Sequence, residues 1–195
     1  RAENSLLATC RDIGRQTSRF PGLAPALLRW STSLADNEAG HEALLRQATC
    51  LLSDIAWRAH PDHRADDAFR QVFTHPGLLL EHRDRAFLAL AVYHRYTGKE
   101  LQEMLERVHG LIREEDVQRA RILGLALRLG ETISGGDPAT LDRFSLLRRD
   151  EDGRLCLHHA AADRALVGEV VVKRLSGLAS AMALGPAIEE THAEG

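Results

Sequence analysis

Apolar residues recur along most of this 195-residue chain at the three- and four-residue spacing of amphipathic helices. Each of these segments is bounded by Pro, Gly or short polar residues, which end helices or cap them. The pattern predicts seven helices, at about residues 4–18, 24–34, 38–55, 64–73, 85–96, 100–108 and 114–129. The last of these is apolar almost all round, as expected for a central helix. It contains Gly124 and Gly130, which lower helix propensity, so we expect a neighbouring helix to approach closely there.

The pattern changes after the turn-rich sequence 135–138. Residues 141–148 and 154–159 alternate as strands do and flank an acidic turn ending in Gly153, which predicts a hairpin. Residues 163–184 return to helical spacing, and we expect a frayed tail after Gly185-Pro186. The predicted fold is mostly α, a helical bundle with a small antiparallel β-hairpin and a closing C-terminal helix. We divide it into a helical domain, 1–136, and a hairpin-plus-helix subdomain, 137–195.

Composition narrows the classes of function. The net charge of −3 argues against general nucleic-acid binding, which requires a broad basic surface. No apolar run approaches the roughly 20 residues of a membrane span, and no secretory signal is visible at the start. Three widely spaced cysteines predict reduced thiols in the cytoplasm. The first residue is not Met, so we expect the chain to be a piece of a longer protein.

Candidate anion-binding residues lie at two places. His60, His63 and Arg64 come at a helix start after a Pro break, where backbone N–H groups and a guanidinium favour an anion. Local capping by His63 and a solvated Arg64 is the alternative. His94 and Arg95 lie near the end of an apolar helix. Both residues contact the same anion, or His94 is a buried core histidine and Arg95 interacts with the C-terminus of the helix.

Three further pairs of residues have simpler explanations. Arg121 and Arg128 share one face of the central helix, and a buried arginine needs an anionic partner. A carboxylate such as that of Asp54 is the common partner, and a bound phosphate is the less common one. His158 and His159 are adjacent in a strand and point to opposite faces, so they are not expected to chelate one metal together. Lys173-Arg174 reads most simply as solvated charge.

Four segments together resemble one family. At residues 10–15, 53–64, 93–95 and 121–129 this chain resembles the C-terminal, HD-related helical region of the exopolyphosphatase/guanosine pentaphosphate phosphohydrolase (Ppx/GppA) family. The resemblance is to the alphaproteobacterial branch of that family. The resemblance implies a parent enzyme whose N-terminal ATPase-like domains hold Mg²⁺ and remove terminal phosphate from polyphosphate or guanosine pentaphosphate. It implies that this C-terminal region holds long polyphosphate and contributes to a homodimer.

The HD resemblance also implies what is missing. In HD-type phosphohydrolases a His-Asp pair binds the catalytic metal, and here Ser53-Asp54 stands at that place. Gly130 stands where another metal-binding Asp would be. Because a hydroxyl is a poor ligand for transition metals, we expect no metal, no cofactor and no catalytic residue in this chain. We expect Asp54 to pair with Arg58 or to hydrogen-bond a neighbouring helix.

The sequence therefore predicts an accessory domain of an exopolyphosphatase-like enzyme that binds polyphosphate and its own N-terminal catalytic domains. The predicted polyphosphate contacts are His60, His63, Arg64, His94 and Arg95. Two alternatives remain: a metal-dependent HD-type nucleotide phosphohydrolase, and a purely structural dimerisation module.

Overall fold

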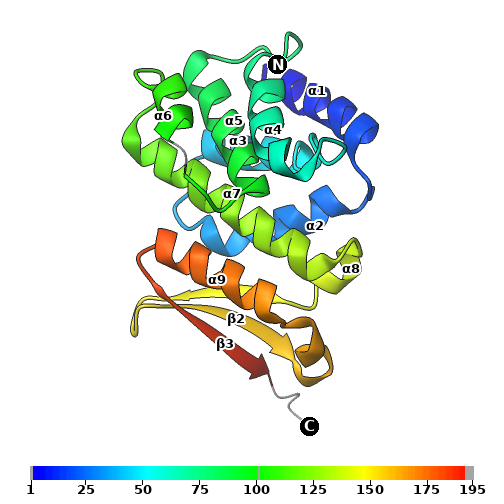
Figure 1. Cartoon of the computed structure of the whole chain (residues 1–195), viewed down its shortest axis with the longest axis vertical. Coiled ribbons are helices and arrows are strands. Elements are labelled where there is room, and N and C mark those ends of the chain that lie inside the picture. The colour runs from blue at the N-terminus through cyan, green and yellow to red at the C-terminus, as the bar shows by residue number, and fades with distance from the viewer. Residues whose placement is uncertain (1, 101, 192–195) are drawn as a thin grey trace.

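A layer of helices packs on a small sheet in the computed structural model, which describes residues 2–100 and 102–191 (Figure 1). The helices are α1 (Ala2–Thr17), α2 (Leu23–Trp30), α3 (Gly40–Leu51), α4 (Arg64–Phe73), α5 (His82–Tyr96), α6 (Gln102–Val108), α7 (Glu114–Ser134), α8 (Pro138–Leu141) and α9 (Glu169–Ala181). The strands are β1 (Ser145–Arg149), β2 (Arg154–Ala160) and β3 (Gly185–Thr191). The mostly α fold predicted from the sequence is confirmed. No helix in the described part of the chain is long and apolar enough to cross a bilayer.

Helices α5 and α7 form the centre of the helical layer. All residues of α5 from Ala86 to Arg95 are buried, including the last two, which are polar. The close approach predicted at the α7 glycines is confirmed. A Cβ on Gly124 would collide with the Ala91 carbonyl oxygen and lie 2.5 Å from the Cβ of His94, and one on Gly130 would lie 2.8 Å from the Trp30 ring. The two glycines therefore let α5 and Trp30 lie directly against α7.

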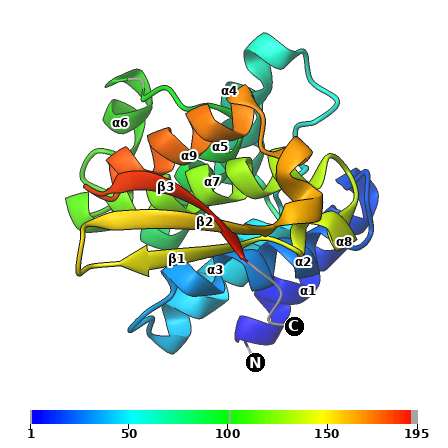
Figure 2. The same ribbon diagram turned by 90° about the horizontal axis from the view of Figure 1, so that it is seen from below.

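The sheet contains the predicted hairpin and one strand that was not predicted. Strands β1 and β2 pair antiparallel around a turn in which Gly153 has a φ of +66°. Residues 185–191, expected to be a frayed tail, form β3 instead and pair in parallel with β2. The prediction failed because parallel strands are joined through a crossover rather than a local turn. Helix α9 is that crossover, and it packs between α7 and the sheet (Figures 1 and 2).

Some helix boundaries also differ from the prediction. The third helix begins at Gly40 rather than near residue 38, because Asn37 adopts a left-handed conformation (φ 63°) in the preceding turn. The Glu42 side chain accepts a hydrogen bond from the Ala39 amide at 2.9 Å at this start. The predicted closing helix divides into a 3₁₀ segment, Ala161–Leu166, and α9. One cluster of buried apolar side chains runs through both the helices and the sheet, from Leu6 to Ala179.

Candidate functional site

Asp54 lies in a buried turn that follows α3. The chain leaves the helix after Leu51 and continues in tight turns to Ala59. Two side chains fix these turns: Tyr96 accepts a hydrogen bond from the Ala56 amide at 3.1 Å, and Trp57 Nε1 donates to the Thr17 carbonyl at 2.6 Å. Asp54 is 2% exposed at this place. A carboxylate buried this deeply must be paired to remain ionised.

Two arginines neutralise Asp54. The backbone N–H and the Nε of Arg19 donate to Oδ2 at 3.0 and 3.2 Å, and Arg19 Nη2 donates to Oδ1 at 2.8 Å. Arg95 Nη2 reaches Oδ1 at 3.3 Å. Burial alone would raise the pKa of Asp54, but the hydrogen bonds and charge of Arg19, with the charge of Arg95, hold it below its usual value. The predicted partner Arg58 lies over the Trp57 ring instead, 5.1 Å from its centroid.

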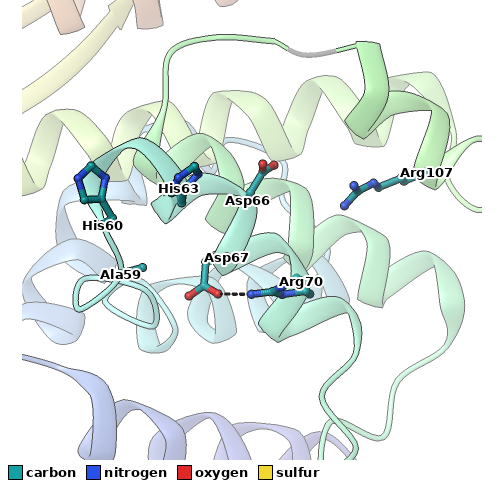
Figure 3. Close-up of a pocket in the computed structure, with 7 residues that line it drawn as sticks. All are labelled: Ala59, His60, His63, Asp66, Asp67, Arg70 and Arg107. Atoms are coloured by element: carbon teal, nitrogen blue, oxygen red, sulfur yellow. Dashed lines mark hydrogen bonds and ion pairs between the residues drawn. The ribbon is translucent and has the colours of Figure 1, made fainter.

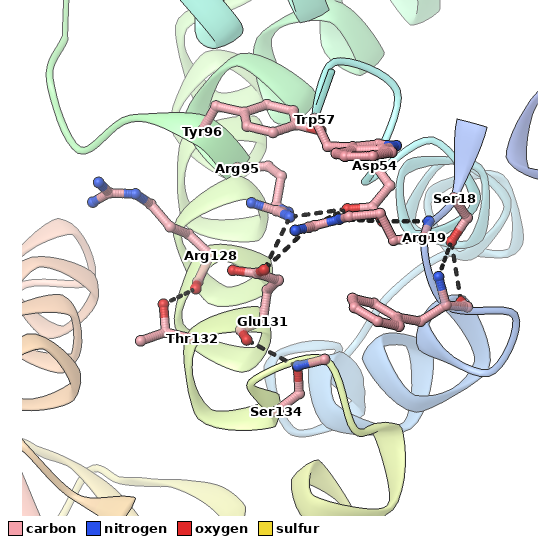
Figure 4. A network of polar contacts seen from close by, with 12 residues as sticks. Ser18, Arg19, Asp54, Trp57, Arg95, Tyr96, Arg128, Glu131, Thr132 and Ser134 are labelled. Carbon is pink, nitrogen blue, oxygen red and sulfur yellow. Dashed lines mark hydrogen bonds and ion pairs between the residues drawn. The ribbon is translucent and has the colours of Figure 1, made fainter. Parts of the chain in front are cut away.

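Glu131 extends this ion pair into a larger group. Its Oε1 lies 3.2 Å from Arg19 Nη2 and 3.9 Å from Arg95 Nη2 (Figure 4). Arg128 and Arg174 come next to them from α7 and α9. We call Arg19, Arg95, Arg128 and Arg174, with Asp54 and Glu131, the arginine cluster. Its four guanidinium groups face two carboxylates, which leaves two positive charges in excess.

Arg128 carries much of that excess. No hydrogen bond or ion pair of its guanidinium is found among the described residues, and Nη1 lies close to Gly98. Figure 4 shows the side chain pointing away from Glu131. Burial lowers the pKa of Arg128 to about 10, and the charges of Arg174 and Arg95 add to this effect. Arg128 therefore remains cationic at neutral pH while it lies among other cations.

Arg174 lies in the same environment, although the sequence suggested solvated charge. It is half-buried and donates a hydrogen bond to Thr132 Oγ1, whereas the neighbouring Lys173 is exposed. Burial lowers the pKa of Arg174, and Arg95 contributes in the same direction against the attraction of Glu131. In addition, the buried Nε of Arg95 has no hydrogen-bond partner among the described residues. An anion placed here would be stabilised by three guanidinium groups.

The predicted residues His60 and His63 lie elsewhere, in a pocket of about 450 Å³ lined by Ala59, His60, His63, Asp66, Asp67, Arg70 and Arg107 (Figure 3). Arg70 is paired with Asp67 at 2.7 Å and Arg107 with Glu103 at 2.7 Å. His60 Nδ1 accepts a hydrogen bond from the Asp62 amide at 3.2 Å. The charges of this pocket are therefore balanced locally.

The structure does not bring the five predicted residues together. Arg64 Nε donates to the Ala59 carbonyl at 3.0 Å, and no hydrogen bond or ion pair in the described part of the chain joins His60, His63 or Arg64 to Arg95. His94 is 2% exposed against Gly124, and burial, with the charge of Arg121, lowers its pKa to about 4. A neutral buried imidazole is a weak ligand for phosphate, so Arg95 is the predicted residue that the geometry favours.

Arg121, which was predicted to share a face of the central helix with Arg128, has a carboxylate partner. Its Nη1 lies 3.2 Å from Glu100 Oε2, so the anionic partner of Arg121 is a carboxylate. For Arg128, a bound phosphate is still a candidate partner.

The HD-type metal position is unsuited to a cation. Both oxygens of Asp54 accept hydrogen bonds from guanidinium groups, which a divalent ion would have to displace. Ser53 is 3% exposed, and the place of a side chain on Gly130 is taken by Trp30. The donor set at this position therefore does not fit the metal of an HD phosphohydrolase.

Sequence reasoning missed Arg19 and Glu131. Arg19 follows α1 and reaches a partner 35 residues away, and Glu131 is one of several charges on the long helix α7. Neither residue belongs to a motif. The signal in the sequence that could have pointed to them was that Asp54, in an apolar segment, needs a cationic partner.

Comparison with known proteins agrees with this architecture. The sequence model of the family described as exopolyphosphatase, C-terminal, matches residues 6–184. No curated protein matches the chain significantly.

Proposed function

The chain belongs to the exopolyphosphatase C-terminal family, and from this premise we propose that it is an accessory domain that holds polyphosphate while separate N-terminal domains with Mg²⁺ cleave it. The observation that carries the proposal is the unpaired guanidinium of Arg128, which lies beside the positive charges of Arg174 and Arg95. Polyphosphate presents about one negative charge per internal phosphate and no base to read. A protein therefore binds it through spaced cations and N–H groups, as it binds a nucleic-acid backbone.

In this proposal, Arg128 and Arg174 contact phosphate oxygens directly. Arg95 contributes its unpartnered Nε, while its Nη2 stays on Asp54. Arg19 and Asp54 position Arg95 rather than contact the ligand. A bound phosphate would offset the mutual repulsion of the three cations, which supports anion binding over a purely structural role. Binding by His60, His63 and Arg64 remains a prediction from the sequence.

The test is titration of the chain with long-chain polyphosphate, using Arg128→Gln and Arg174→Gln. A hydrogen bond to a charged group contributes about 1.5–3 kcal/mol, so each substitution is expected to weaken binding about tenfold or more. Arg15→Gln is the control, because this side chain is 74% exposed on α1 and paired with Asp12. Equal affinity of all four proteins, or loss in the control alone, would refute the proposal.

We also propose that the C-terminal part of the chain contributes to a homodimer. Five large apolar side chains are at least 40% exposed there: Leu147, Leu166, Val170, Val172 and Ile188. Exposed large apolar side chains of this kind are found at interaction surfaces. Sedimentation of the chain at increasing concentration, with Val170→Ser as the variant, tests this. A wild type that stays monomeric at every concentration contradicts it.

A further inference from the structure

Three potential metal ligands meet on the outer face of the sheet. Strand alternation directs Leu155 and Leu157 toward the core, so Cys156 and His158 share the opposite face of β2. Strand β3 runs beside β2 (Figure 2), and its register places Glu189 opposite His158. The three residues thus form one group, although His158 and Glu189 are 31 positions apart in the sequence.

The distances are close to those of a coordination sphere. Cys156 Sγ lies 3.8 Å from Glu189 Oε1, His158 Nε2 lies 3.6 Å from Glu189 Oε2, and all three ligand atoms lie within 4.8 Å of one another. In a tetrahedral zinc site with bonds of about 2.0–2.3 Å, the ligand atoms are about 3.3–3.8 Å apart. Small side-chain movements therefore suffice to place one ion between them.

His158 gives an independent indication. Its Nε2 is buried and has no hydrogen-bond partner in the described part of the chain. A buried nitrogen without a partner costs free energy. It points at Glu189 from a distance too long for a hydrogen bond.

We propose that Cys156, His158 and Glu189 bind one Zn²⁺, with water as the fourth ligand. A thiolate, an imidazole and a carboxylate are all ligands that zinc accepts in proteins. On binding, the Sγ–H bond of Cys156 breaks, its proton passes to solvent, and the sulfur electron pair forms the bond to zinc. The ion then ties β3 to β2.

Arg149 would oppose a cation here, but its contacts leave one oxygen of Glu189 for the ion. Its Nη1 donates to Glu189 Oε1 at 2.8 Å, while Nε and Nη2 hold Asp152 at 3.0 and 2.7 Å. The carboxylate can therefore keep Arg149 on Oε1 and offer Oε2 to zinc. In that arrangement Arg149 orients the ligand, as hydrogen-bonded groups around metal sites commonly do.

The sequence predicted that His158 and His159 do not chelate one metal together. These two do lie on opposite faces, since His159 is 4% exposed and its Nδ1 donates a hydrogen bond to the Ala160 carbonyl at 2.7 Å. The ligands that complete the group come from Cys156, two residues earlier, and from β3, which was not predicted.

Equilibrium dialysis against Zn²⁺ with metal analysis tests the proposal, and Co²⁺ reports the thiolate through its sulfur-to-cobalt absorption band. We expect one ion per chain, at least tenfold weaker binding in Cys156→Ser and His158→Gln, and loss of the band in Cys156→Ser. His109→Gln is the control, because this exposed histidine lies outside the group.

The proposal is overturned if the wild type binds no zinc, or if Cys156→Ser binds it as tightly. Cys156 is fully buried, so its variant must first show wild-type circular dichroism. If it does not fold, Glu189→Gln decides in its place, because that side chain is 36% exposed. Unchanged zinc affinity in Glu189→Gln would then overturn the proposal.

Discussion

Replacing Asp54 by Asn tests how the arginine cluster is held together. The carboxylate is 2% exposed and accepts hydrogen bonds from Arg19 and Arg95. Asparagine keeps one carbonyl oxygen but removes the negative charge. Arg19 is 28% exposed and can turn toward water, whereas Arg95 is 5% exposed and remains buried.

Removing one partner of a buried ion pair costs about 3–5 kcal/mol, because the other charge stays buried without compensation. Glu131, 3.9 Å from Arg95 Nη2, retains part of the attraction. We therefore expect the lower end of that range, about 3 kcal/mol. For a chain of this size such a loss lowers Tm by about 6–12 °C.

Urea unfolding followed by circular dichroism measures the loss, with Asp12→Asn as the control. Asp12 is 59% exposed and paired with Arg15, so its replacement should change stability by less than about 0.5 kcal/mol. A loss below about 1 kcal/mol for Asp54→Asn, similar to that of the control, would refute the claim that Asp54 neutralises a buried arginine.

Other predictions concern the α5–α7 contact and pH. Gly124→Ala should destabilise the fold by about 1–3 kcal/mol in urea, because its Cβ would meet the Ala91 carbonyl. Gly177→Ala, in α9 with open space around it, should instead stabilise by about 0.5–1 kcal/mol, and the same sign for both would contradict the packing. His94, with a pKa of about 4, is neutral in the folded chain while the unfolded one binds a proton below about pH 6.5. Stability should therefore fall as pH drops from about 6.5 to 4, and this dependence should be weaker in His94→Gln. Below about pH 4, protonation of Asp54, whose pKa is depressed, should lower stability further, and an acid unfolding curve that is flat in Asp54→Asn and wild type alike would contradict this.

Local signals predicted the elements that depend on local sequence. The helix 64–73 was predicted with the boundaries observed, and the hairpin followed from its acidic turn and alternating strands. Strand β3 was missed because its partner β2 is about 30 residues away and is reached through α9. Its single large apolar residue, Ile188, is 40% exposed and gives little strand signal.

The candidate site was predicted in part, for the same reason. Sequence reasoning selected Arg95 and recognised that Arg128 needs an anion, because both lie in apolar helices. It could not place Arg19 beside Asp54 or Arg174 beside Arg128, since these contacts depend on how the helices pack. It grouped His60 and His63 with Arg95, whereas the structure places them in a pocket whose charges are already balanced.

The salt dependence of polyphosphate affinity tests the central claim most directly. Each cation that contacts a phosphate of a single chain adds about 0.7 to the slope of log K against log salt, by analogy with single-stranded nucleic acids. If Arg128 and Arg174 contact phosphate, the double variant Arg128→Gln/Arg174→Gln should bind more weakly and with a slope shallower by about 1.4. A double variant with the affinity and slope of the wild type would contradict the account.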